Sequence, residues 1–179
     1  MWSFQLAYAT ALIQAAPSKF FGGVLVLDSS GDPLEFRCTT PVQPLPIQHV
    51  LWGQRLKRYI LTELLLIPLV NSLKTPCDLV LVEDADFLGA RTKISVPLLL
   101  VSQGGGQQGP EDEDRTVIFA DPLAPEQKIC LTCTRGFEDD LDSGRRLVEA
   151  FARSCVPLEP FRRIEEALKL LKPQLESRA

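Results

Sequence analysis

The order of its predicted elements places this chain in the α/β class, with one mixed β-sheet. The segment 20–40 has an apolar run, a turn and an alternating run, which is typical of a β-hairpin. Helical periodicity appears at 47–67 and again near the C-terminus. The strand-like segments 97–102 and 116–120 have no crossover helix between them. About six strands and about three helices are therefore expected, in an order closer to α+β proteins than to strict β–α alternation.

The hairpin at 20–40 is the clearest local signal. Residues 24–27 (VLVL) form a continuous apolar run, as in a strand buried on both faces. Ser-Ser-Gly-Asp at 29–32 supplies turn residues, and Gly31 can adopt a positive φ. The following run alternates apolar and polar residues, which predicts one solvated face. Gly22 and Gly23 indicate a bulge or a close backbone approach.

A long helical pattern follows the proline-rich segment 41–46. Within 47–67 the stretch LTELLLIPLV is apolar nearly all round, which predicts a central, buried helix. Pro68 is expected to end or kink this helix.

The remaining elements complete a single globular domain at 1–179. Alternation near 4–8 favours an opening strand, and short apolar runs predict strands at 79–82, 97–102, 116–120 and 128–133. Amphipathic helices are expected at 138–154 and 159–171. The Gly-rich and then acidic segment 103–115 is predicted to be a flexible loop.

Composition and charge narrow the expected partners. The 179-residue chain is 45% hydrophobic and carries a formal charge of −4. This balance gives no global attraction to phosphate backbones, so nucleic acid is expected to be an unlikely partner. No apolar run reaches 18 residues, which predicts no membrane span and no membrane partner. Five scattered cysteines favour reduced thiols and a cytoplasmic location.

An acidic cluster at 83–86 is the strongest candidate for chemistry. Asp84 and Asp86 follow the predicted strand at 79–82 and could share a Mg²⁺, with Glu83 beside them. The string VLVEDADFLGA resembles the D-x-D strand end of the toprim metal-binding domain. That family also has a glutamate in an upstream E-G motif, and this chain contains no E-G dipeptide. The alternative is an acidic, solvated turn.

Asp28 ends the first strand of the hairpin. The string VLVLDSSGDPLEF resembles the hairpin of RNase H-like nucleases, in which a first-strand aspartate is a metal ligand. This resemblance implies that Asp28 would join the 83–86 cluster at one metal site. The alternative is that Asp28 caps the turn through its side chain.

Three weaker motifs carry no predicted activity. The GGGQQG segment is followed by Pro110 and four carboxylates, which would repel a phosphate. Cys130 and Cys133 lie in a predicted strand, where residues three apart face opposite ways. His49, the only histidine, has no accompanying catalytic motif.

Two functions from different classes remain. The first is a non-enzymatic, protein-binding accessory subunit without a cofactor, because no catalytic constellation is evident. Its partner would be another protein or a second copy, docking on aromatic residues that include Trp52 and Tyr59. The second is a Mg²⁺-dependent phosphoryl-transfer or nuclease-type enzyme that uses the cluster at 83–86.

Overall fold

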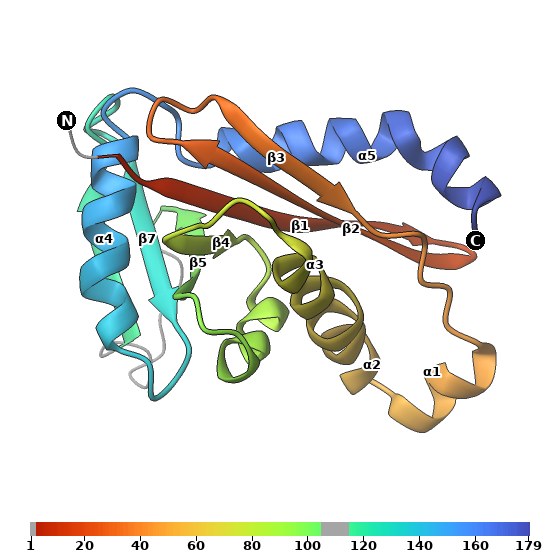
Figure 1. Cartoon of the computed structure of the whole chain (residues 1–179). Coiled ribbons are helices and arrows are strands. Elements are labelled where there is room, and N and C mark those ends of the chain that lie inside the picture. Colours follow the sequence, from red (N-terminus) through yellow and green to blue (C-terminus); the bar gives the residue numbers. More distant parts are fainter. Residues whose placement is uncertain (1–2, 105–114) are drawn as a thin grey trace.

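A computed structural model describes residues 3–104 and 115–179 and confirms the predicted mixed sheet (Figure 1). The sheet has seven strands in the order β3-β2-β1-β4-β5-β7-β6. Strands β1, β4 and β5 are parallel, and all other neighbouring pairs are antiparallel. The strands are β1 (Gln5–Ala15), β2 (Ser18–Asp28), β3 (Pro33–Cys38), β4 (Leu79–Val82), β5 (Leu98–Gln103), β6 (Thr116–Ala120) and β7 (Lys128–Cys133).

Helical segments cover both faces of this sheet (Figure 1). They are α1 (Pro46–Trp52), α2 (Arg55–Tyr59), the π-helical η1 (Ile60–Leu66), α3 (Ile67–Ser72), the 3₁₀-helical η2 (Ala85–Lys93), α4 (Asp139–Phe151) and α5 (Glu159–Ser177). Within the described ranges no helix is long and apolar enough to cross a membrane. Of the predicted loop at 103–115, residues 105–114 lie outside the described residues.

The alternation of side chains along the central strands produces two hydrophobic cores. In β4, Leu79 and Leu81 pack in the core under α4 and α5, whereas Val80 and Val82 pack in the core under η1 and η2. All four residues of β4 are buried, because both faces of the strand are covered. This explains why its sequence reads as a continuous apolar run.

The predicted hairpin corresponds to β2 and β3, and its turn is held by Asp28. The Oδ1 atom of Asp28 accepts hydrogen bonds from the backbone N–H of Ser30 (2.9 Å) and of Asp32 (3.0 Å). Gly31 has a φ of 84°, which favours glycine at this position. Gly23 marks a close approach to α5, because a Cβ atom there would lie 2.6 Å from Ile164 Cγ2.

The predicted helix at 47–67 is divided into segments. Gly53, with a φ of 54°, separates α1 from α2, and α1 contains no buried residue. Helical structure also continues past Pro68 to Ser72. Immediately before this proline, the backbone N–H of Ile67 bonds to the carbonyl of Thr62, five residues back. The π-helical segment thus carries the chain to Pro68, which lies in the first turn of α3, where its missing N–H is tolerated.

Candidate functional site

The carboxyl end of β4 lies beside the middle of β1, a central strand that continues past it to Ala15. Ala9 pairs with Val82 in parallel register, so the residues that follow, Thr10 and Glu83, lie side by side. Thr10 Oγ1 donates a hydrogen bond to Glu83 Oε1 at 2.7 Å. In open α/β sheets, ligands bind outside the carboxyl ends of the strands, so this end of β4 is the expected place for a site.

A pocket of about 210 Å³ opens at this end of β4. Its wall combines a hydroxyl group and two carboxylates with apolar side chains from β1, η1 and η2. The lining residues are Thr10, Ala11, Ile13, Leu61, Glu83, Asp84 and Phe87. Polar oxygens therefore converge on a partly apolar cavity, as is typical of ligand sites.

Asp84 is held by two sets of contacts. Its Oδ1 atom accepts a hydrogen bond from the backbone N–H of Asp86 at 2.9 Å, which caps η2. Lys57 of α2 places its Nζ atom 2.6 Å from Asp84 Oδ2 and 3.3 Å from Asp86 Oδ2. The hydrogen bond to Asp84 and the nearby negative charges raise the pKa of Lys57. The acidic cluster is therefore tied to α2 through one ammonium group.

The donor set fits a magnesium ion that keeps part of its coordination for water and substrate. Glu83 and Asp84 supply hard carboxylate oxygens at the pocket, and Mg²⁺ commonly uses one or two carboxylates together with substrate phosphates. Within residues 3–104 and 115–179 no three or more His, Cys, Asp or Glu side chains are grouped so that they could hold a metal ion. Substrate oxygens would therefore have to complete the coordination.

Asp28 lies at the opposite end of the strands from the pocket. It pairs with Gln5 at the start of β1, whereas Glu83 follows Val82, the partner of Ala9 further along β1. The structure therefore does not bring Asp28 to the cluster at 83–86. The carboxylate of Asp28 instead accepts the turn hydrogen bonds described above.

Thr10 and Lys57 are site residues that the sequence reasoning did not identify. Thr10 is a polar residue within the largely apolar stretch LAYATALI of β1, and this interruption was the available signal. Lys57 reaches the site only because α2 and the segment after β4 come together across 27 residues. Nothing in the sequence around Lys57 shows that contact.

An ion pair between a half-buried arginine and a buried aspartate holds η2, the segment that begins within the acidic cluster. Arg91 Nε lies 2.6 Å from Asp140 Oδ2, and Arg91 Nη2 donates to Asp140 Oδ1 at 3.1 Å. Asp140 Oδ2 also accepts from the backbone N–H of Leu98 at 3.3 Å. The Arg91 guanidinium lies 4.2 Å from the ring centroid of Phe137. These contacts join η2, β5 and α4.

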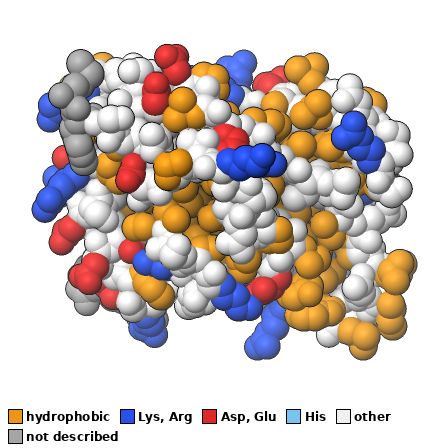
Figure 2. Space-filling model, viewed as in Figure 1, with side chains coloured by type: hydrophobic (Ala, Val, Ile, Leu, Met, Phe, Trp, Pro, Cys, Tyr) orange, Lys and Arg blue, Asp and Glu red, His pale blue; other side chains and the backbone are white. Residues whose placement is uncertain are grey.

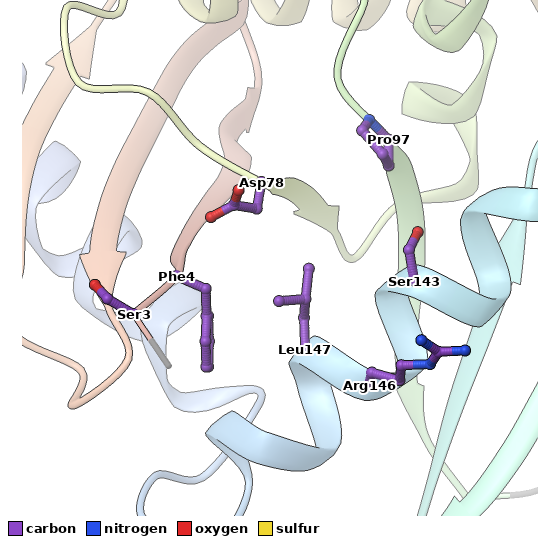
Figure 3. A pocket seen from close by; sticks show the side chains of 7 residues that line it. All are labelled: Ser3, Phe4, Asp78, Pro97, Ser143, Arg146 and Leu147. Carbon is purple, nitrogen blue, oxygen red and sulfur yellow. The ribbon is translucent and has the colours of Figure 1, made fainter. Parts of the chain in front are cut away.

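A second pocket, of about 310 Å³, lies where β4 and β5 begin (Figure 3). Its lining residues are Ser3, Phe4, Asp78, Pro97, Ser143, Arg146 and Leu147. Asp78 accepts the backbone N–H of Gln5 at 2.8 Å. In Figure 3, the Asp78 carboxylate and the Arg146 guanidinium lie on opposite sides of Leu147, so these charges do not converge as the polar groups of the first pocket do.

Trp52 and Tyr59, the predicted docking aromatics, stack on each other. Their ring centroids are 4.5 Å apart and their planes differ by 26°. The pair connects the last residue of α1 with the last residue of α2. Trp52 remains 42% exposed.

Comparison with known proteins reveals similarity in structure only. No protein-family model and no curated protein sequence matches this chain significantly. Endonuclease V from Bacillus subtilis shares 14% identity and a TM-score of 0.61, with 99% of this chain and 83% of that chain covered. An endonuclease V variant from Ciona intestinalis, in complex with a 23mer DNA containing an inosine followed by a ribo-adenosine, shares 11% identity and a TM-score of 0.55. That match covers 99% of this chain and 87% of the other.

These matches overturn two expectations from the sequence. The interpretation as a non-enzymatic, protein-binding subunit is wrong, because the chain is similar over its full length to nuclease structures. The expectation that nucleic acid is an unlikely partner, with protein or a second copy preferred, is wrong as well, because the Ciona intestinalis variant and a second Ciona intestinalis endonuclease V structure, with a TM-score of 0.53, both contain DNA. The net charge of −4 is a sum over the whole chain, so it could not exclude a nucleic-acid contact made by a few residues at one place on the surface. The seven-stranded mixed sheet with its covering helices is an endonuclease V-like fold.

Proposed function

We propose that this protein binds nucleic acid and hydrolyses its phosphodiester bonds with a divalent metal ion at the pocket lined by Thr10, Glu83 and Asp84. One observation carries the proposal. In an endonuclease V-like fold, the polar pocket lies at the carboxyl end of β4, beside the parallel strand β1, and open α/β sheets bind their ligands outside the carboxyl ends of their strands.

Each polar residue of the pocket has a distinct role in this proposal. Thr10 holds one oxygen of Glu83 and leaves the other oxygen for a ligand. Asp84 provides a second carboxylate, whose orientation is fixed by the η2 cap. Lys57 is paired with Asp84 and Asp86 in the absence of metal. Once a cation binds these carboxylates, the Lys57 ammonium group can form an ion pair with a substrate phosphate instead. A bound divalent metal supplies positive charge to the phosphoryl oxygens as their negative charge develops.

A cytoplasmic location belongs to the same proposal. Each of the five cysteines is present as a thiol. Thiols of this kind are typical of proteins kept in a reducing compartment.

Labelled oligonucleotides test binding and cleavage separately. Single- and double-stranded DNA and RNA, with and without an inosine, are titrated in EDTA and then incubated with Mg²⁺ or Mn²⁺. Binding in EDTA and cleavage with metal are expected, and Glu83→Gln is expected to abolish cleavage while binding persists. Asp28→Asn is the matched control, because it changes a carboxylate at the opposite end of the strands and its amide oxygen can still accept the turn hydrogen bonds. The absence of binding, or equal cleavage by wild type and Glu83→Gln, would contradict the proposal.

The ion pairs of Lys57 favour a second candidate, which is nucleic-acid binding without cleavage. Lys57 already neutralises Asp84 and Asp86, so a basic side chain takes the place that a metal would need. In this case binding would be independent of metal and no product would form. Replacement of Lys57 by Met would then weaken binding rather than change any rate of cleavage.

A further inference from the structure

We propose that α1, together with the preceding Leu45, inserts into the surface of a lipid bilayer that carries anionic headgroups. The feature behind this inference is a group of exposed apolar side chains on a short helix that contains no buried residue. Val50 and Leu51 are 77% and 76% exposed. The complete group, called the α1 tip below, is Leu45, Ile47, Val50, Leu51 and Trp52.

The α1 tip is held in place by its own contacts, so its exposure is a property of the fold. Gln48 Oε1 accepts a hydrogen bond from the backbone N–H of Leu45 at 2.8 Å, which fixes the start of the helix. At the other end, the backbone N–H of Gly53 donates to the carbonyl of His49 at 3.0 Å. Trp52 stacks on Tyr59 and ties the helix to α2. Turning the apolar side chains inward would require these contacts to break.

The position of α1 suits contact with a flat, extended surface. In Figure 1, α1 lies at an extremity of the molecule, away from the sheet and from α4 and α5. Figure 2 shows hydrophobic side chains gathered over the same corner. A protruding apolar tip fits a bilayer because lipid chains adapt to its shape, whereas a protein partner would have to present a complementary groove. Nucleic acid can accept single apolar side chains between its bases, whereas a bilayer accommodates all five side chains of the α1 tip at once.

The charges near the α1 tip match an anionic surface. No Asp or Glu occurs between Glu35 and Glu63, and the interval contains Arg55 and Arg58 of α2, which follows the α1 tip. The other two cations of the interval, Arg37 and Lys57, are paired with acidic side chains and do not contribute. Arg55 forms no ion pair with the described residues. Lys and Arg near a membrane surface are attracted to anionic lipids, and tryptophan is enriched at the interface. This shallow mode of binding departs from the expectation of no membrane partner, which rested on the lack of a spanning segment alone.

Vesicle binding tests this inference on the full-length chain. The Trp2→Phe variant leaves Trp52 as the one tryptophan, so its emission reports on the α1 tip. Vesicles of phosphatidylcholine are compared with vesicles containing 30% phosphatidylglycerol. We expect binding to the anionic vesicles, a blue shift of Trp52 emission, quenching by brominated lipid chains, and weaker binding in high salt.

Two matched substitutions make the test specific. Leu51→Glu should lower the partition coefficient about tenfold or more, because it places a charge where the leucine side chain would enter the bilayer. Leu170→Glu, at an 81% exposed leucine on α5, should leave it unchanged. Absence of binding to both vesicle types, or equal effects of the two substitutions, would overturn the inference. So would a dimer or a nucleic-acid complex that Leu51→Glu abolishes in a protein that does not bind vesicles.

Discussion

Replacing Asp140 by alanine should destabilise the whole protein through the ion pair with Arg91. Asp140 is 5% exposed and meets Arg91 through two hydrogen bonds, at 2.6 and 3.1 Å. The substitution leaves the half-buried Arg91 guanidinium without its counter-charge, with the Ile94 carbonyl as its remaining acceptor, and removes the acceptor for the backbone N–H of Leu98. Breaking a buried pair from one side costs about 3–5 kcal/mol in the free energy of unfolding. The lower half of this range is expected, because Arg91 is only half-buried and keeps its hydrogen bond to Ile94, although the backbone donor of Leu98 is orphaned.

Urea denaturation followed by circular dichroism measures this free energy. A double variant, Arg91→Met with Asp140→Leu, separates loss of the pair from loss of a charge partner. It should be less destabilised than Asp140→Ala, since no uncompensated charge remains. A loss below about 1 kcal/mol for Asp140→Ala would refute the reasoning. So would a double variant that is as unstable as the two single changes added together.

Three further predictions follow from other contacts. Gly23→Ala should cost about 1–3 kcal/mol of unfolding free energy, because its new Cβ would lie 2.6 Å from Ile164; unchanged thermal unfolding would contradict the packing described. A hydrogen bond from the backbone N–H of Thr75, and next a hydrogen bond from the Arg37 side chain, lower the pKa of Glu35 from 4.5 to about 2. The stability that it contributes is therefore complete above about pH 4.5 and is lost as the pH falls towards 2. Glu35→Gln should flatten acid unfolding in that window, and an identical pH profile would count against the contact. Burial raises the pKa of the Cys77 thiol from 9.0 to about 11, so its alkylation at pH 8 should be about 100-fold slower in the folded protein than in urea. The Cys77→Ser variant identifies the part of the signal that comes from Cys77. Equal alkylation rates of Cys77 in the folded protein and in urea would show that the thiol is accessible.

Local sequence patterns correctly predicted elements whose residues are all buried or have strong turn preferences. Strand β4 was evident because both of its faces are buried, and the β2–β3 turn because Asp28 and Gly31 have strong turn preferences. The division of the predicted helix at 47–67 was missed because it depends on the backbone of a single glycine, Gly53. A periodic pattern alone cannot show that the helical stretch before Gly53 faces solvent.

The candidate site depended on information that a local pattern does not contain. Glu83 meets Thr10 because β1 and β4 are parallel neighbours, and strand order is set by packing across the chain. The same register separates Asp28 from the acidic cluster, since an antiparallel partner carries its last residue to the start of β1. The resemblance of the hairpin to RNase H-like nucleases therefore agreed with the nuclease structures that this fold matches. Asp28, the metal ligand chosen from that resemblance, lies away from the candidate site.

The pairing of β1 with β4 also has a consequence for how the chain acquires its structure. Strands β1, β2 and β3 are consecutive, so this meander can form soon after its residues leave the ribosome. Its β1 edge must then wait for β4, because the Thr10–Glu83 contact spans 73 residues. Until β4 arrives, an apolar strand with open backbone donors and acceptors is available to other chains. Aggregation during synthesis should accordingly depend on how quickly residues 79–82 become available to cover that edge.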